Sequence, residues 1–555
     1  MKASHRIAWF FTLSVIVCAA LGGVYGQRVE ATINDDAGSE KAVAENLNAF
    51  AKVFTLVEQN YADPVNPDHA IFGPENNNTL GAIPSMLHTL DPHSNFFDAA
   101  TYARLRETEE GQYYGVGMKI LSVPLKGGQW TTTVTEPMPG SPAFRAGIRP
   151  GDLLLKIDGH PTLDMDGEMV AKRLKGPKGT VVQVTVSREG YDNPLDVTLT
   201  RGQITGLSVD NSFLIRPGVG YVHIATFSET TSDEMTDALK KLGEGSLKGL
   251  ILDLRGNPGG VVQTAVGVAD HFLDKHQLIV YHRGRNSSER RYFAKSDGKG
   301  TYPIVVIIDH GTASAAEIVT GALQDHDRAL VIGETSFGKG LVQTPYNLSE
   351  GTGLLLTTTH YYTPSGRLIQ RNYDNVSLYD YMYAHVQGPA PHAEVHHTDG
   401  GREVFGGAGL APDIQVSEPA YNRVEGELVA AGSCSDFLLC GPFYEFSRYY
   451  LGTHKTVERD FRPDEQVVQA FRGYLAQQGV MLSDQEVQDN LPFIDEHLRE
   501  VTVGIVYGED QALAMTAKND FLVQKAIDSL AQSADLISRS KAYRTSLRSA
   551  NRPPG

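Results

Sequence analysis

Cysteine is scarce in this sequence, with three residues among 555. So few thiols exclude a disulfide-framework fold and a multi-cysteine zinc site. Cys18 lies near the N-terminus, and Cys434 and Cys440 are separated by a short loop. In an exported protein those two can pair, but two unrelated thiols fit the spacing equally well. The sequence leaves that question open.

Positive charge is also in short supply. The chain carries 49 Lys and Arg against 66 Asp and Glu, a net charge of −17. Nucleic-acid binding depends on neutralising phosphates, so we expect no nucleic-acid partner. Hydrophobic residues make up 41% and charged residues 21%, which excludes a largely disordered chain. A length of 555 residues suits three or four domains.

Only one long apolar run occurs, and it lies at the N-terminus. Lys2, His5 and Arg6 form a basic start, and residues 7–24 follow without a charge. This pattern in residues 1–26 indicates either a secretory signal or an uncleaved membrane anchor, between which the length does not decide. We therefore expect an exported protein of the periplasm or cell envelope, free or tethered to the inner membrane through residues 7–24.

Composition and apolar spacing divide the rest of the chain into four segments. Residues 42–103 have helical spacing and predict an N-terminal helical region. Residues 104–201 carry short alternating strands separated by glycine turns. Residues 202–418 alternate strand and helix, which predicts an α/β layer architecture. Residues 419–555 are mostly helical and give no indication of their role.

The third segment is regular enough to predict individual elements. Apolar runs bounded by turn residues indicate strands, and longer stretches with helical periodicity indicate helices. The expected strands are 220–224, 249–253, 278–281, 304–309 and 329–332, and the expected helices are 232–242, 262–272 and 315–323.

Residues 104–201 resemble a PDZ domain. The markers are Gly140-Ser141-Pro142-Ala143 and the run from Ala146 to Asp152. PDZ domains bind an extended C-terminal peptide as an added strand, and a glycine loop of backbone N–H groups holds its carboxylate. The resemblance assigns that loop to Tyr114, Gly115, Val116 and Gly117.

Ser314 lies where a predicted strand turns into a helix. Small neighbours on both sides leave room for a substrate carbonyl, and a helix N-terminus favours negative charge developing at its oxygen. The alternative is a helix cap, because Ser314 and Glu317 have the spacing of a capping box.

A second glycine-rich segment, Gly333 to Gly340, contains Lys339. Its spacing matches a phosphate-binding P-loop, but Gly340 stands where Ser or Thr is needed and Pro345 interrupts any helix. A nucleotide site is therefore disfavoured against an exposed lysine in a turn. Taken with Ser314, the lysine has a third interpretation: a general base whose pKa is lowered by apolar surroundings and whose amine is oriented by Gln343.

These segments together resemble the C-terminal processing peptidases, or tail-specific proteases, which are serine proteases with a Ser/Lys dyad and an inserted PDZ domain. The resemblance covers residues 42–418. Its ordered markers, besides the PDZ, Ser314 and Lys339 segments, are Asp91-Pro92-His93-Ser94, residues 252–260, residues 361–367 and Ala411-Pro412-Asp413.

The resemblance implies a multidomain α/β protein: a crotonase-like α/β serine protease core, an inserted PDZ domain, and helical segments at both ends. It makes Ser314 the nucleophile, Lys339 the general base and Gln343 the residue that orients the base. Asp325 falls where some members carry a supporting acid, and a surface carboxylate at a helix end is the open alternative. No metal and no cofactor are implied.

The resemblance also implies an oxyanion site formed by backbone N–H groups. The groups that it assigns belong to Gly259, Gly260 and Ala315. The same glycine run also suits a simple strand-to-helix turn, and the two interpretations are compatible.

The function implied is endoproteolysis of exported proteins that are recognised by their exposed C-terminal tails. A non-catalytic PDZ scaffold that binds tails without cutting them is the alternative. The sequence gives neither the natural substrate nor the oligomeric state, nor whether the PDZ domain activates or inhibits.

Histidines offer weaker alternatives. His310 and His360 flank the site segments, so a serine–histidine triad is an alternative to the dyad, although each is expected to be a polar residue near a strand end. His93, beside Pro92, is expected to cap a turn. A metal cluster at His392, His396 and His397 is disfavoured, because no carboxylate stands at ligand spacing.

Overall fold

The computed structural model describes residues 37–550 except 63, 74–80, 125–128, 189, 299, 385–393, 418, 431–440 and 455–456. The predicted signal or anchor, His392 and the pair Cys434 and Cys440 lie outside the described residues, so the predictions about them stay predictions.

The chain forms two compact units, residues 1–85 and 86–555. The first contains α2 (Ala37–Asn60) and α3 (Pro67–Phe72), and α4 (Ala82–His88) begins in it. The side chain of Asn66 accepts hydrogen bonds from two N–H groups of α3, which starts a new helix there. The boundary falls inside the predicted helical region 42–103 because its last part includes a strand, β1 (Asn95–Phe97), which pairs with β18 (Gly353–Tyr362) in the second unit.

The PDZ segment forms a sheet of six antiparallel strands in the order β3-β4-β5-β7-β8, with β6 paired to β5. Alternate valines of β7 are fully buried, so one face of this sheet packs on its own core. β2 precedes the strands of this sheet in the chain and β9 follows them, and the two pair with each other as an antiparallel ribbon. The elements are β2 (Gln112–Gly115), β3 (Met118–Pro124), β4 (Trp130–Pro137), α6 (Pro142–Arg145), β5 (Leu153–Ile157), β6 (His160–Pro161), α7 (Gly167–Leu174), β7 (Val181–Ser187), β8 (Leu195–Thr200) and β9 (Gly202–Thr205).

The predicted α/β core, residues 202–418, contains a six-stranded sheet in the order β10-β11-β12-β15-β16-β21, parallel from β11 onward. Every residue of β12 and β15 is buried, as expected for strands covered on both faces. This confirms the α/β prediction, while the crotonase-like assignment stays a prediction. The elements are β10 (Asn211–Arg216), β11 (Val219–His223), α8 (Thr231–Lys241), β12 (Gly249–Asp253), α9 (Val262–Phe272), β15 (Ile304–Ile308), α10 (Ala315–Asp325), β16 (Leu330–Gly333) and β21 (Ile414–Gln415).

A second sheet of the core has the order β1-β18-β13-β14, with β17 paired to β18. It brings the strand that follows Lys339 next to the long strand β18. Its remaining strands and the neighbouring elements are β13 (Leu278–Gly284), β14 (Ser287–Phe293), β17 (Leu341–Asn347), α5 (Ala99–Glu110), α11 (Leu378–Tyr383), β19 (Val395–His397) and β20 (Glu403–Phe405).

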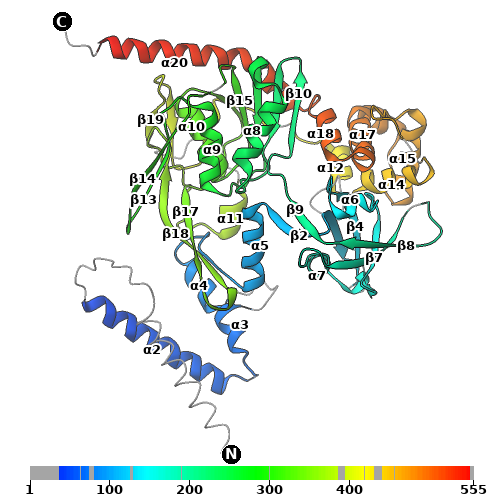
Figure 1. The fold of residues 1–555 in the computed structure, drawn as a ribbon, viewed down its shortest axis with the longest axis horizontal. Coiled ribbons are helices and arrows are strands. Elements are labelled where there is room, and N and C mark those ends of the chain that lie inside the picture. The colour runs from blue at the N-terminus through cyan, green and yellow to red at the C-terminus, as the bar shows by residue number, and fades with distance from the viewer. Residues whose placement is uncertain are drawn as a thin grey trace, which may run out of the picture. The chain divides into compact units, whose positions relative to one another are not determined.

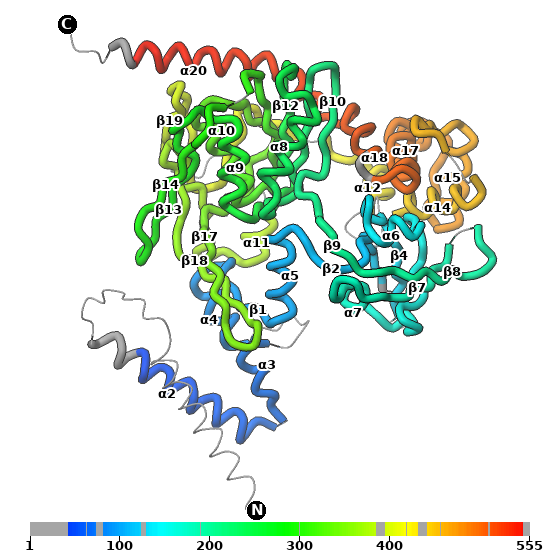
Figure 2. Tube along the Cα trace, in the orientation of Figure 1, coloured from blue at the N-terminus to red at the C-terminus, as the bar shows by residue number. Residues whose placement is uncertain are grey.

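The C-terminal segment divides its helices between two places. One group forms a bundle with its own apolar core and lies beside the PDZ sheet, with which it lines a shared cavity (Figures 1 and 2). The last two helices, α19 (Phe521–Asp528) and α20 (Leu530–Ala550), return to the core and pack on its parallel sheet. The bundle consists of α12 (Arg423–Ala430), α14 (Pro442–Thr453), α15 (Glu465–Gln477), α16 (Asp484–Asp489) and α17 (Leu491–Tyr507), with α18 (Glu509–Thr516) following.

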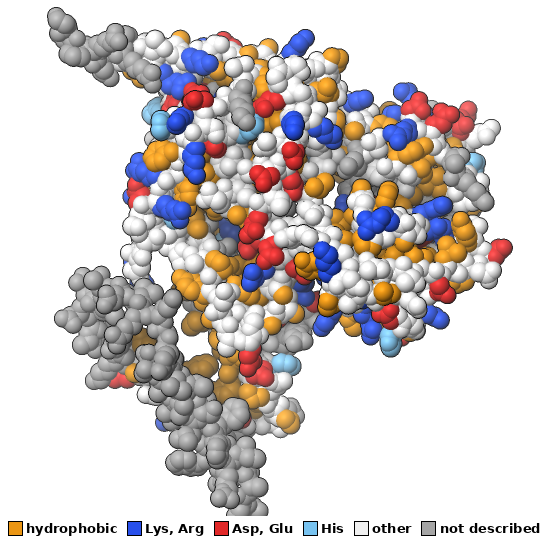
Figure 3. All heavy atoms as spheres, viewed as in Figure 1, with side chains coloured by type: hydrophobic (Ala, Val, Ile, Leu, Met, Phe, Trp, Pro, Cys, Tyr) orange, Lys and Arg blue, Asp and Glu red, His pale blue; other side chains and the backbone are white. Residues whose placement is uncertain are grey.

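Two surface properties bear on the sequence predictions. Acidic and basic side chains are interspersed on the face shown in Figure 3, so the net negative charge is not gathered into one patch there. Among the described helices, none combines the length and the apolar character needed to cross a bilayer.

The packing of α19 makes a stability prediction. Leu522 is 3% exposed and packs with the sheet residues Ile251 and Val305, whereas its neighbour Phe521 is 50% exposed. Leu522→Ala removes buried methyl groups and should lower the free energy of unfolding by about 2–5 kcal/mol. Phe521→Ala, the matched control, should change it little. Thermal denaturation of both variants measures the difference, and equal shifts would contradict this packing.

Candidate active site

Ser314 stands between the end of β15 and the start of α10. Its backbone has φ 53° and ψ −114°, a region that residues other than glycine rarely occupy. Such a conformation costs about 1–3 kcal/mol and is found mainly where function maintains it. The helix cap predicted as an alternative is present in part, because Glu317 accepts a hydrogen bond from the Ser314 N–H. The two interpretations are therefore compatible.

The carboxylate of Glu317 joins the serine segment to the lysine segment. Its Oε2 accepts hydrogen bonds from the backbone N–H of Ser314 at 2.7 Å and of Lys339 at 2.9 Å. Its Oε1 accepts from Ser336 Oγ at 2.5 Å and from the N–H of Gly338 at 2.8 Å. Glu317 is fully buried, and burial raises its pKa while these four donors oppose the rise. One buried side chain thus fixes both segments.

Lys339 is half-buried, and its Nζ donates a hydrogen bond to Gln343 Oε1 at 3.0 Å. Burial lowers the pKa of Lys339, and the negative charges of Asp91 and Glu317 work in the opposite direction. This contact is the one expected if Gln343 orients the amine, and that role stays a prediction. Among the described residues, no hydrogen bond joins Ser314 Oγ directly to Lys339 Nζ; such bonds often tighten only when substrate is bound.

Sequence reasoning expected apolar surroundings for the lysine but missed two polar rings near it, His93 and Tyr381. His93 Nε2 lies 2.8 Å from the Tyr381 hydroxyl, and both rings contact Phe337 edge to face. Burial, followed by the positive charge of Lys339, lowers the pKa of His93 to about 4. The turn assigned to His93 is instead made by Asp91, whose carboxylate accepts from two backbone N–H groups. The one sequence feature that pointed to a role for His93 in the site was its place in the family marker at residues 91–94.

The three residues predicted to bind the oxyanion lie together but do not have equal roles. Built on Gly259, a Cβ atom would lie 2.7 Å from both Ser314 Cβ and the Ala315 nitrogen, so only glycine fits there. The Gly259 N–H is already bound to Asn257 Oδ1 at 2.8 Å. Hydrogen bonds among the described residues leave the N–H groups of Gly260 and Ala315 free.

Asp325 lies at the far end of α10 from Ser314. It forms an ion pair with Arg367, and its Oδ2 accepts a hydrogen bond from the Ser365 N–H at 2.9 Å. At 2% exposure it is not the surface carboxylate offered as the alternative. Its contacts stabilise the turn at residues 363–367 and do not reach Ser314 or Lys339.

The two histidines of the alternative triad point elsewhere. His310 pairs with Glu334 at 3.6 Å. His360 is next to Tyr361 on β18, and the Tyr361 hydroxyl donates to the Ser314 carbonyl at 3.0 Å. Because successive side chains of a strand alternate between its faces, His360 is directed away from Ser314. His396 and His397 lie on β19, and no metal-binding group of three ligands is found among the described residues.

Of the four residues assigned to carboxylate binding, Tyr114 and Gly115 form the end of β2 and pair with β9. Val116 and Gly117 follow the strand and turn their carbonyls inward. The Val116 carbonyl accepts from the Ala143 N–H, and the Gly117 carbonyl accepts from Ser141 Oγ at 2.7 Å. Within the described part of the chain, no hydrogen bond engages the N–H groups of Val116 and Gly117. Gly117 has φ +72°, and a Cβ there would lie 2.4 Å from Ser141 Cβ. Two backbone donors are thus available to an anion.

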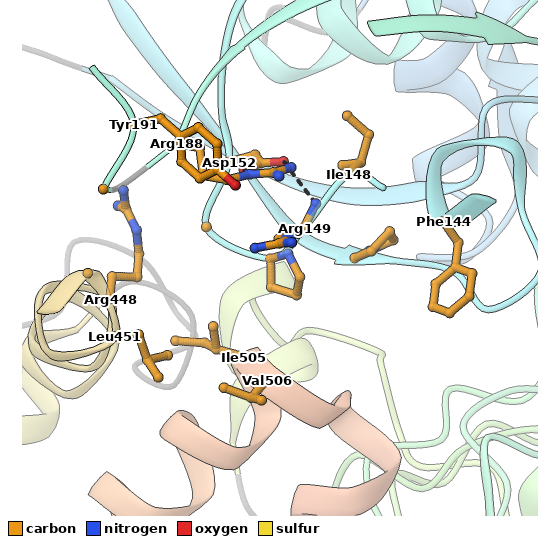
Figure 4. A pocket seen from close by; sticks show the side chains of 15 residues that line it. Phe144, Ile148, Arg149, Asp152, Arg188, Tyr191, Arg448, Leu451, Ile505 and Val506 are labelled. Atoms are coloured by element: carbon orange, nitrogen blue, oxygen red, sulfur yellow. Dashed lines mark hydrogen bonds and ion pairs between the residues drawn. The ribbon is translucent and has the colours of Figure 1, made fainter. Parts of the chain in front are cut away.

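A separate cavity of about 510 Å³ lies between the PDZ domain and the C-terminal bundle (Figure 4). Arg188 and Asp152 pair on its PDZ side, and Arg448 and Leu451 of α14 face them. It shares no lining residue with the Ser314 and Lys339 segments.

Two segments of the chain match known protein families. Residues 218–376 match the model of peptidase family S41, and residues 133–188 match the model of a PDZ domain. The chain is therefore a serine-type peptidase that carries a PDZ domain, which disfavours the non-catalytic scaffold.

The similarity to curated proteins extends over most of the chain. It is 34% identical to the carboxy-terminal-processing protease of Bartonella bacilliformis over 76% of this chain and 85% of that protein. Identity is 39% with the corresponding protease of Synechocystis, over 52% of this chain and 67% of that one. A photosystem II D1 C-terminal processing protease structure is 28% identical, covering 66% of this chain and 92% of its own, with a TM-score of 0.33. The chain belongs to the carboxy-terminal processing protease family.

Glu317 provides a test of the geometry. Glu317→Gln keeps the size of the side chain but replaces one acceptor oxygen by an NH₂ donor that must face N–H or O–H donors. We expect cleavage to fall at least about 100-fold, as for a displacement of about 1 Å between reacting groups. Unfolding experiments should also show a loss of about 1–3 kcal/mol for the unsatisfied buried groups. Cleavage near the wild-type rate would contradict the joining role of this carboxylate.

Proposed function

We propose that this peptidase cleaves with a serine–lysine dyad. Ser314 Oγ attacks the peptide carbonyl carbon while neutral Lys339 takes the hydroxyl proton. The tetrahedral intermediate collapses, the C–N bond breaks, and Lys339 gives its proton to the leaving amine. Water, deprotonated by Lys339, then hydrolyses the acyl ester and restores Ser314. The shared Glu317 oxygen, which bonds the N–H of both residues, is the observation that carries the assignment.

Three further contacts support the assigned roles. Gln343 holds the amine of Lys339. Burial of Lys339 favours its neutral form, which a base requires. The free N–H of Ala315 directly follows Ser314, and the free N–H of Gly260 comes directly after Gly259, which packs against Ser314. Backbone donors of this kind stabilise the oxyanion of acyl transfer.

The dyad predicts a specific pH dependence. Lys339 is active only when it has lost its proton, so the rate should rise with pH through one ionisation and stay high above it. Because burial lowers the pKa of Lys339, this rise should lie below the value of about 10.4 found for free lysine. Lys339→Arg should be inactive at every pH, since a guanidinium does not deprotonate.

Rates of peptide cleavage between pH 5 and pH 10 measure this dependence, with Ser314→Ala as the inactive reference. His310→Ala and His360→Ala are the matched controls and should keep most activity. An active Lys339→Arg together with an inactive histidine variant would replace the dyad by a triad.

We further propose that the substrates are proteins with exposed C-terminal tails. The free N–H groups of Val116 and Gly117 offer two donors to a terminal carboxylate, while the tail adds as a strand to the PDZ sheet. Residues 1–26 support an exported enzyme of the cell envelope, and the same run can tether it through residues 7–24.

Tail recognition predicts a loss of preference when the loop is distorted. Gly117→Val places a side chain against Ser141 and strains a positive φ, so it should disturb the loop. The preference for a peptide with a free C-terminal carboxylate over its amide should fall toward one. Gly159→Val shares the positive φ, at +78°, but has open space, and is the matched control. Relative kcat/KM for the two peptides measures the preference; an unchanged ratio in Gly117→Val would refute this role.

A further inference from the structure

The end of the C-terminal segment contacts the glycine loop beside Ser314. Asp520 precedes α19, and its Oδ2 accepts a hydrogen bond from Arg255 Nη2 at 2.9 Å. The same Nη2 donates to Asp253 Oδ2 at 2.6 Å. Asp253 ends β12 and its side chain is 1% exposed, so one guanidinium bridges a buried carboxylate and a carboxylate of the last helices. A buried charge is stable only with such a partner.

Arg255 is the first residue of the loop that leads to Gly260. The N–H of the next residue, Gly256, donates to Asp309 Oδ1 at 2.9 Å. The Asn257 carbonyl accepts from the N–H of Ala313 at 2.8 Å, the residue before Ser314. Thus the loop is held at one end by Arg255 and along its length by the serine segment. Only a few residues separate Arg255 from the N–H of Gly260.

We propose that Asp520 is a positioning residue for catalysis, which acts through Arg255 on the glycine loop at residues 256–260. The C-terminal helix α19, which Asp520 caps, therefore contributes to the active site besides covering the sheet. This inference rests on the proposed function, because it assigns to that loop the stabilisation of the oxyanion.

The two oxygens of Asp520 have separate partners, which makes a precise variant available. Oδ1 accepts a hydrogen bond from the Val523 N–H at 2.8 Å and caps α19, whereas Oδ2 binds Arg255. Asn and Ser cap helices about as well as Asp. Asp520→Asn and Asp520→Ser should therefore keep the cap and the helix while they remove the ion pair. Asp528→Asn, at an exposed position on the same helix, is the matched control.

The experiment uses the full-length enzyme, a fluorogenic peptide with a free C-terminal carboxylate, and an aldehyde of the acyl half of that peptide. The aldehyde adds to Ser314 Oγ and places an oxyanion in the site, so its Ki reports transition-state binding. For Asp520→Asn and Asp520→Ser we expect kcat to fall about 10- to 100-fold, Ki to rise by the same factor, and KM to change less than about two-fold. Asp528→Asn should leave all three within about two-fold of wild type.

Unchanged kcat and Ki in the Asp520 variants would overturn the inference, even if the melting temperature fell, because Asp520 would then only fasten the last helices. A rise in KM without a fall in kcat would overturn it as well. Ser314→Ala separates this failure from that of the proposed function. If Ser314→Ala still cleaves, the dyad is wrong; if it is inactive while the Asp520 variants are normal, only the positioning role is wrong.

Discussion

The buried carboxylate of Glu317 is the interaction on which the arrangement of the site depends. Its four donors come from the start of α10 and from the segment before β17, which are also joined by a backbone hydrogen bond from the Phe337 N–H to the Thr312 carbonyl. A desolvated carboxylate is costly unless every lone pair is used, so the position of each donor is tightly defined. The same requirement helps to maintain the unusual backbone of Ser314, because its N–H is one of the four donors.

Burial among neighbouring side chains favours the neutral form of Lys339. Phe337, Tyr381 and His93 pack together near the lysine, and His93 is uncharged near neutral pH. Two carboxylates, Asp91 and Glu317, pull the pKa of Lys339 upward, while burial pulls it down and dominates. The net effect is a pKa of Lys339 below its ordinary value, which is the direction that the proposed role of general base requires.

The local sequence pattern was sufficient to predict most strands and helices of the parallel core. The strand at 249–253 and the helix at 262–272 have the predicted bounds, because buried parallel strands are continuous apolar runs and their helices are strongly periodic. The two glycine-rich turns with Ser314 and Lys339 could also be recognised, since their small residues are needed at fixed spacing. The N-terminal helical prediction, by contrast, missed β1, whose partner β18 is more than two hundred and fifty residues away in the chain.

Long-range pairs could not be predicted from spacing. Asp325 was assigned to the site by position, yet it pairs with Arg367, and nothing in the local sequence distinguishes a catalytic carboxylate from one that stabilises a turn. The sequence of the C-terminal segment gave no indication of its role, because its contacts are with residues far away in the chain. Its last helices fill the open face of the parallel sheet with Leu522 and Val523. A sheet whose strands are apolar on both faces requires such a cover, so the uncovered face was itself a signal that a later segment must return to the core.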